Sequence, residues 1–130
     1  MKTKKILIIS ALYYDKISKK MENIAINHLK SKKIRFKLIN VPGAFEIPVM
    51  IAKNKNKYDG FIALGCVIKG QTPHFDFISA AVTNSIMNIS VNIAKPVGNG
   101  IITCLNKKQA TNRCFKSLDA TKAVISVLKQ

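Results

Sequence analysis

Four short apolar stretches alternate along this chain with segments of helical periodicity, and this alternation sets the fold class. The apolar stretches span residues 5–10, 36–41, 60–67 and 97–104. Stretches of this length and composition are typical of strands that are buried on both faces. Repeated strand–helix units with short connections therefore predict an α/β fold, in which helices cover both faces of a parallel sheet.

The helical segments are recognised by apolar residues that recur every three or four positions. The clearest are residues 17–29 and residues 78–93, and Pro96 marks the end of the second one. A short helix is expected over residues 45–52, and helical sequence resumes near residue 107 and leads to a last helix over residues 120–128.

The length of the chain limits it to one domain. With 130 residues it can build one substantial core but not two, so we expect a single domain over residues 1–130. Apolar residues make up 48% of the sequence, which excludes disorder, and no apolar run approaches the roughly 18 residues of a membrane span. Lysines followed by Ile6–Ile9 imitate a signal peptide, but the run is short and reads better as the first strand.

The net charge of +16 raises the hypothesis of nucleic-acid binding. The basic residues are lysines except for Arg35 and Arg113, and arginine is the type favoured for bidentate recognition of bases and phosphates. The lysines are also spread over every segment of the sequence. We therefore expect non-specific attraction to polyanions but no specific nucleic-acid partner.

The cysteines predict neither a disulfide framework nor a metal site. Cys66, Cys104 and Cys114 form an odd set without a paired short spacing, and only His28 and His74 could assist them. His28 falls on the apolar stripe of the first helix, which favours a place at the edge of the core over a role as a ligand. A reducing, cytoplasmic location fits this cysteine usage.

The most informative motif begins within the third apolar stretch and spans residues 65–76. Gly65 and Gly70 allow a close approach of the backbone to a ligand, and Lys69 and Thr72 can bind an anion next to the amino terminus of the following helix. His74 then lies where a general acid or base is wanted. Each feature alone is common in α/β proteins. Together, at the carboxyl end of a parallel strand, they favour a functional site.

Three motifs in combination resemble the lumazine synthase family: Val41–Pro48, Gly65–Asp76 and Pro96–Thr103. The resemblance runs in register from about Lys5 to Arg113, and the remaining residues align loosely. It implies a flavodoxin-like three-layer αβα sandwich with a four-stranded parallel sheet. It also implies a pentamer with active sites between neighbouring subunits, and neither a metal nor an organic cofactor.

The activity that this resemblance implies joins two small molecules. One is the ribitylaminopyrimidinedione 5-amino-6-(D-ribitylamino)uracil, and the other is the phosphorylated butanone 3,4-dihydroxy-2-butanone 4-phosphate. The products are 6,7-dimethyl-8-ribityllumazine, inorganic phosphate and water, in the penultimate step of riboflavin biosynthesis.

The resemblance assigns the ribityl-bearing substrate to three segments. Tyr13 matches an aromatic residue that stacks on the pyrimidine, although it could also be an ordinary rim aromatic. The ribityl chain is expected to bind at the second segment, which comprises Ala44, Phe45 and Glu46. Glu46 could otherwise be an acidic residue in the first turn of a helix, where the helix dipole favours it. The main chain of the third segment lines the pyrimidine, so Cys66 is expected to be a lining residue and not a nucleophile. The third segment comprises Cys66, Val67 and Ile68.

The phosphate side and the proton carrier come from other positions. Gly70, Gln71 and Thr72 match the phosphate-side loop, and His74 matches the residue that transfers protons. Arg113 matches a phosphate-binding arginine from the adjacent subunit, where its planar fork suits an anion. By itself Arg113 would be read as a solvated helix charge. Asp76 is expected to orient the imidazole or to cap the helix.

The chain departs from the family pattern at several points. Tyr14 stands where an asparagine is frequent, and Asn99 stands where many members carry an aromatic that packs over the pyrimidine from the neighbouring subunit. The segment after Arg113 is about five residues short, which leaves Lys116 as the best match to a second basic site residue. This shortening, with only about four residues before the first strand, favours a free pentamer, or pentamers stacked weakly into decamers, over a sixty-subunit shell.

A non-catalytic alternative stays open from the sequence. A family member of this charge could bind flavin-like ligands or polyanions without turning over the substrate pair. The combined presence of Phe45, Glu46, Thr72, His74 and Arg113, which serve different steps, favours an enzyme.

Overall fold

The central sheet has four parallel strands, as predicted. The computed structural model describes residues 4–130, so residues 1–3 of the predicted domain lie outside the described residues. The strands lie in the order β2-β1-β3-β4, and each pairs with its neighbour in parallel. Their bounds are β1 Lys5–Ala11, β2 Arg35–Val41, β3 Gly60–Ile68 and β4 Val97–Cys104.

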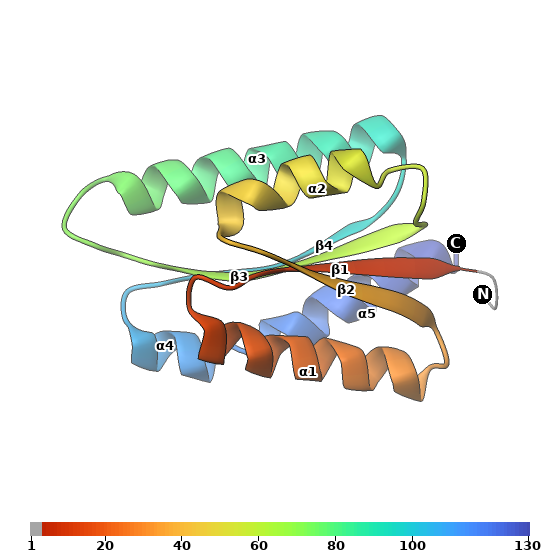
Figure 1. Ribbon diagram of the computed structural model, residues 1–130, viewed down its shortest axis with the longest axis horizontal. Coiled ribbons are helices and arrows are strands. Elements are labelled where there is room, and N and C mark those ends of the chain that lie inside the picture. Colours follow the sequence, from red (N-terminus) through yellow and green to blue (C-terminus); the bar gives the residue numbers. More distant parts are fainter. Residues whose placement is uncertain (1–3) are drawn as a thin grey trace.

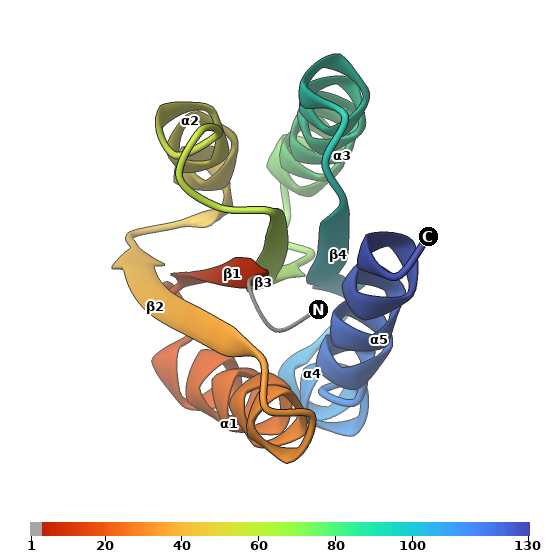
Figure 2. The same cartoon turned by 90° about the vertical axis from the view of Figure 1, so that its right-hand side faces the viewer.

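Helices cover both faces of this sheet and complete a flavodoxin-like three-layer sandwich. Figure 1 shows one helical layer above the sheet and one below it, and Figure 2 shows the same layers from the end. One layer contains α1 (Asp15–Ser31), α4 (Lys107–Asn112) and α5 (Lys116–Leu128). The other contains the 3₁₀ turn η1 (Ala44–Glu46), α2 (Ile47–Lys53) and α3 (His74–Ile93). None of the described helices is long and apolar enough to cross a membrane.

The central strands divide the core into two halves. Side chains of successive residues point to opposite faces of a strand. In β1, Ile6 and Ile8 pack against the layer of α1 and α5, whereas Leu7 and Ile9 pack against the layer of α2 and α3. All four are fully buried. This two-sided burial explains why β1 and β3 are apolar runs instead of alternating patterns.

The element boundaries differ from the predicted ones in local ways. The segment predicted as one helix from residue 45 begins as η1, and Pro48 occupies the first turn of α2, where its missing N–H costs nothing. The third strand continues to Ile68, so Gly65 lies inside the strand against Ala11 and not in the ligand loop. The long helix ends at Ile93, where Ala94 adopts a left-handed conformation with a φ of 55° before Pro96 is reached.

The close approach of α5 to β4 depends on a glycine. A Cβ added to Gly98 would lie 2.4 Å from the carbonyl oxygen of Ala120 and 2.8 Å from a methyl group of Val124. Because the first of these atoms belongs to the helix backbone, rotation of a side chain cannot relieve the clash. Residue 98 must therefore be glycine for α5 to pack at this distance.

We predict that Gly98→Ala lowers the free energy of unfolding by about 1–3 kcal/mol, because α5 must move away from β4. Urea denaturation followed by circular dichroism measures the effect. Gly70→Ala is the matched control, since an added Cβ there meets nothing within 4 Å. Equal stability of Gly98→Ala and the wild type would contradict the proposed packing constraint.

Candidate active site

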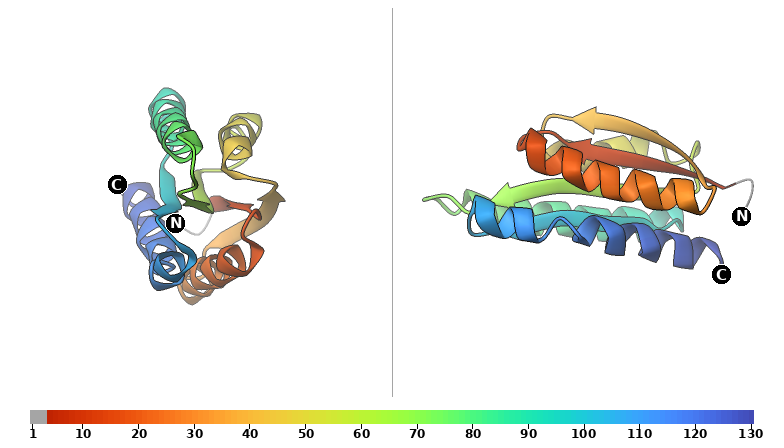
Figure 3. Two further views of the ribbon diagram at one scale, coloured as in Figure 1. Left: turned by 90° about the vertical axis from the view of Figure 1, so that its left-hand side faces the viewer. Right: turned by 90° about the horizontal axis from the view of Figure 1, so that it is seen from below.

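The candidate site lies where the chain changes direction across the sheet. β1 is flanked by β2 on one side and β3 on the other, and the helices that follow β1 and β3 lie on opposite faces. This arrangement opens a crevice at the carboxyl ends of the strands, where open α/β sheets bind ligands. Figure 3 (left) shows this end facing the viewer. A cavity of about 300 Å³ occupies it.

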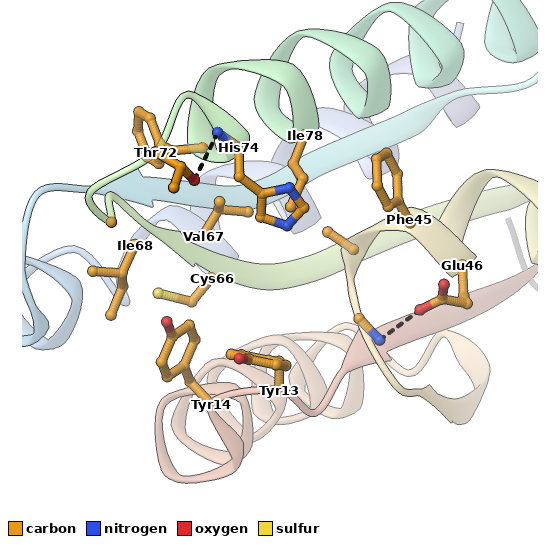
Figure 4. Close-up of a pocket in the computed structure, with 14 residues that line it drawn as sticks. Tyr13, Tyr14, Phe45, Glu46, Cys66, Val67, Ile68, Thr72, His74 and Ile78 are labelled. Carbon is orange, nitrogen blue, oxygen red and sulfur yellow. Dashed lines mark hydrogen bonds between the residues drawn. The ribbon is translucent and has the colours of Figure 1, made fainter.

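The cavity brings together most of the predicted site residues, which come from four segments of the chain. Those that line it are Tyr13, Ala44, Phe45, Glu46, Cys66, Val67, Ile68, Thr72 and His74. Gly43, Gly70, Tyr14, Phe75 and Ile78 complete the lining. Figure 4 shows the two tyrosines on one side, His74 and Thr72 on the opposite side, and Phe45 and Glu46 closing one end.

Two tyrosines follow β1, separated from it by Leu12. Tyr13 keeps 76% of its surface exposed, and the edge of one ring meets the other at a centroid distance of 4.9 Å and an interplanar angle of 79°. Tyr14 is partly buried against the core on the side of α1. Burial, and next the neighbouring Tyr13, raises the pKa of Tyr14. An exposed aromatic ring beside the cavity provides a surface on which a planar ligand can stack.

The end of β3 offers unpaired backbone to the cavity. β3 pairs with β1 only up to Leu64, which lies opposite Ser10, whereas its pairing with β4 continues to Ile68. Residues 65–68 therefore have no strand on the side where β1 ends. The N–H and C=O groups on that side can bind a ligand that carries both donors and acceptors, such as a pyrimidinedione.

Cys66 contributes a neutral wall to the cavity. It is 7% exposed, and burial, followed by the neighbouring Cys104 thiol, raises the pKa of Cys66 to about 12. A thiol with this pKa stays protonated at neutral pH, and the nucleophile in cysteine chemistry is the thiolate. The environment of Cys66 is thus consistent with its expected role as a lining residue.

Glu46 closes the turn that follows β2. Its Oε1 accepts a hydrogen bond from the backbone N–H of Gly43 at 2.8 Å, and its own N–H donates to the Gly43 carbonyl oxygen at 3.2 Å. The structure describes no hydrogen bond to the other carboxylate oxygen. One oxygen therefore orders the turn, and the other can accept a hydrogen bond from a ligand hydroxyl. Phe45 beside it is half exposed.

His74 is the first residue of α3. Its side chain is exposed and points into the cavity, and its backbone N–H lies 3.4 Å from Thr72 Oγ1. The free N–H groups of the first turn of this 20-residue helix create a positive end next to the cavity. No hydrogen bond between described residues joins Asp76 to the imidazole, and Asp76 does not cap α3, so its expected role is not seen.

Three predicted site residues do not reach this cavity, and neither does Lys69. Gln71 is exposed in the loop before α3. The carboxamide oxygen of Asn99 accepts a hydrogen bond from the N–H of Ile101 on β4. Arg113 donates from Nη1 to the Thr103 carbonyl oxygen at 2.9 Å. Arg113 lines a second cavity of about 310 Å³, together with Lys116 and Phe115 at the end of β4.

Sequence reasoning missed several lining residues. The sequence predicts Tyr14 only as a departure from the family pattern and Ile78 only as part of the apolar stripe of a helix, and it assigns no role to Phe75. Ile78 lies four positions after His74, so the two share a face of α3, and this spacing could have indicated it. Among the described residues, no group of three or more His, Cys, Asp or Glu side chains is arranged to hold a metal ion.

The chain belongs to the lumazine synthase family. The family model described as 6,7-dimethyl-8-ribityllumazine synthase matches residues 3–130. The chain is 40% identical over 111 residues to the 6,7-dimethyl-8-ribityllumazine synthase of Bartonella tribocorum, covering 83% of this chain and 74% of that protein. It is 36% identical over 137 residues to the protein of the same name from Afipia carboxidovorans, covering 96% and 84% of the two chains. These matches confirm the resemblance of the motifs.

We predict that Cys66 in the folded protein reacts with iodoacetamide about a hundredfold more slowly at pH 8 than in the unfolded chain, because its raised pKa leaves little thiolate. Mass spectrometry of the Cys66 peptide gives both rates, with urea-unfolded protein as the control. The folded rate should still be rising at pH 10, where the unfolded rate has levelled off. Similar rates at pH 8 would show that folding does not raise the pKa of this thiol.

Proposed function

We propose that this chain is a lumazine synthase. It condenses 5-amino-6-(D-ribitylamino)uracil with 3,4-dihydroxy-2-butanone 4-phosphate to 6,7-dimethyl-8-ribityllumazine, phosphate and water. The observation that carries the proposal is the unpaired backbone of residues 65–68, which faces two tyrosines across a cavity that also receives the imidazole of His74. Family membership identifies the chemistry that such a cavity would serve.

The protein binds the pyrimidine through contacts with both the edge and the face of its ring. Its ring carries N–H donors and carbonyl acceptors at its edge, which pair with the backbone groups of Cys66 and Ile68 on the side that β1 leaves open. The exposed ring of Tyr13 covers its face. Both interactions fix the plane of the ring, so the two amino groups are directed toward the second substrate.

The ribityl chain lies along the turn after β2. Its hydroxyls both donate and accept hydrogen bonds, and the free oxygen of Glu46 accepts from them while backbone groups of residues 43–45 are near enough to line the same end. The half-exposed ring of Phe45 packs against the carbon chain. Binding of the ribityl chain thereby determines the orientation in which the pyrimidine binds.

The phosphorylated ketone lies on the side of α3. The amino terminus of α3 and the hydroxyl of Thr72 attract its phosphate, and Arg113 of a neighbouring subunit supplies a positive charge that binds the same phosphate. The carbonyl carbon then faces the pyrimidine amine. Because phosphate must leave during the reaction, groups that bind it as an anion also stabilise its departure.

His74 moves the protons. An amine first condenses with the ketone and releases water, phosphate is then eliminated, and the second amine closes the ring with loss of a second water. A proton is taken up or released at each of these steps, and an imidazole can both accept and donate one. Such transfer is worth about 10²–10⁴ in rate, whereas holding two reactants in register can supply roughly 7–11 kcal/mol at the limit. We therefore assign the larger share of catalysis to positioning.

A site shared between subunits accounts for the residues outside the cavity. Arg113 and Lys116 line their own opening at the end of β4, where they can reach the cavity of an adjacent copy. The surface of α3 supports such contacts: residues 70–94 contain no lysine or arginine, and Phe77, Met87 and Val91 are largely exposed on it. In a chain of charge +16, an apolar face without cations suits contact with another copy. We propose a pentamer, as the family resemblance implies.

The remaining expectations complete the proposal. The chain would work as one domain over residues 1–130, in the cytoplasm and without a metal or organic cofactor. The three cysteines are buried and unpaired, which suits a reducing compartment. Its partners would be the two substrates and further copies of itself, with no specific nucleic acid.

The test of the reaction is an assay with both substrates, in which the lumazine is followed by absorbance and fluorescence against the spontaneous rate. We predict that His74→Ala slows turnover by about 10- to 100-fold without abolishing it, because orientation remains. Asp76→Asn, a neighbouring change on the same helix turn, is the control and should change the rate much less. A wild-type protein that binds the pyrimidine but gives no product above the spontaneous rate would favour the non-catalytic alternative.

We predict that two impaired variants restore each other when they are assembled together. His74→Ala keeps Arg113, and Arg113→Gln keeps His74, so a site shared between subunits is intact in about a quarter of the interfaces of a random mixture. Activity of the co-expressed mixture measures this, and light scattering should give a mass near five subunits. Lys108→Gln on α4, the helix that ends just before Arg113, controls for loss of charge. A monomeric mass, or no recovery in the mixture, would contradict the shared site.

A further inference from the structure

Tyr13 has to present a flat face to the pyrimidine although little of it is held by the protein. It is 76% exposed, so it would be expected to sample several rotamers. Among the aromatic rings of the described residues, it contacts only Tyr14, edge to face, with 4.9 Å between the ring centroids. Tyr13 also lies in a turn between β1 and α1, with no regular secondary structure to restrain it.

Tyr14, in contrast, is held firmly. It precedes α1 directly, and its carbonyl oxygen accepts the N–H of Ser18 at 3.0 Å. Its ring packs against the core on the side of α1 and lines the same cavity as Tyr13. In Figure 4 its hydroxyl points toward the cavity wall at Cys66 and Ile68. A ring anchored in this way can fix a neighbour by an edge-to-face contact.

We propose that Tyr14 is a positioning residue for the pyrimidine site: its ring fixes the orientation of Tyr13, and thereby presets the stacking surface before the substrate arrives. The inference rests on the proposed function for the identity of the ligand. Presetting one rotamer lowers the entropy lost on binding, so the effect falls on affinity for the pyrimidine and not on the phosphorylated ketone.

The ring of Tyr14, and not its hydroxyl, carries this role. The hydroxyl makes no hydrogen bond to another described residue, and the raised pKa of Tyr14 keeps it neutral at physiological pH. Tyr14→Phe keeps the edge-to-face contact, so it should keep the orientation of Tyr13. Tyr14→Leu keeps the apolar packing on α1 but removes the aromatic edge, so it is the informative variant.

The first measurement needs no ligand. In protein with labelled tyrosine, the ring signals of Tyr13 should be shifted from solvent-averaged values by the Tyr14 ring in the wild type. In Tyr14→Phe the Tyr13 signals should remain shifted, and in Tyr14→Leu they should return to solvent-averaged values. Tyr58, which lies against Phe61, is the internal control and should not change. Averaged Tyr13 signals in the wild type would overturn the proposal, whatever the activity of the protein.

The second measurement is a double-mutant cycle on binding of the pyrimidine substrate, by titration calorimetry. Tyr14→Leu should raise its Kd about two- to tenfold, with little change in kcat or in the KM of the ketone. In a Tyr13→Ala background the same change should have no further effect, because no ring remains to be oriented. Additive losses, or an equal loss in Tyr14→Phe, would overturn the role. Absence of pyrimidine binding by the wild type would instead refute the proposed function and leave the ring measurement to decide this one.

Discussion

Burial of β1 and β3 on both faces is the constraint on which the rest of the structure depends. These strands expose almost nothing to solvent, so helices must cover both sides of the sheet, and every connection must cross from the end of one strand to the start of the next. With β1 in the interior of the sheet, the chain moves outward first to β2 and then to β3 on the other side. The helices that leave β1 and β3 separate at that point, and the cavity lies between the turn that precedes α1 and the start of α3, next to η1. The site is thus a consequence of how the core is covered.

The fold was predictable because its main determinant is local in sequence. A strand buried on two sides needs an uninterrupted apolar run, and a helix buried on one side needs apolar residues at a spacing of three to four, so both patterns are visible without coordinates. The details that were missed depend on tertiary packing or on single residues. The 3₁₀ turn at Ala44–Glu46 follows from the hydrogen bonds between Gly43 and Glu46, and Gly65 belongs to β3 because β4 pairs with it to the last residue.

The candidate site was predictable to the extent that its residues follow strands in compact motifs. Segments after β1, β2 and β3 meet at one edge because the strands are parallel, so residues around Tyr13, Phe45 and His74 converge as expected. Tyr14 and Ile78 could be placed in the lining only once α1 and α3 were positioned around the cavity. Arg113 is the opposite case, because the sequence predicts it as a site residue but it lies outside this cavity. Its type and position fit a phosphate ligand, but within one chain it faces a different opening, and this separation is what makes a neighbouring subunit necessary to the proposed mechanism.

The cationic side chains are distributed unevenly between the cavity and the rest of the molecule. The lining of the cavity includes no lysine or arginine, although the chain carries a net charge of +16. In the absence of a neighbour, the positive end of α3 is the main attraction that the cavity itself offers to an anion. The exposed lysines act from further away: their summed field can raise the encounter rate of a phosphorylated substrate, but salt screens it beyond roughly 8 Å under physiological conditions. A field of this kind cannot distinguish the substrate from the transition state. Selective stabilisation of the departing phosphate therefore has to come from groups held in contact with it, such as the amides of α3 and, in the proposed pentamer, the guanidinium of Arg113.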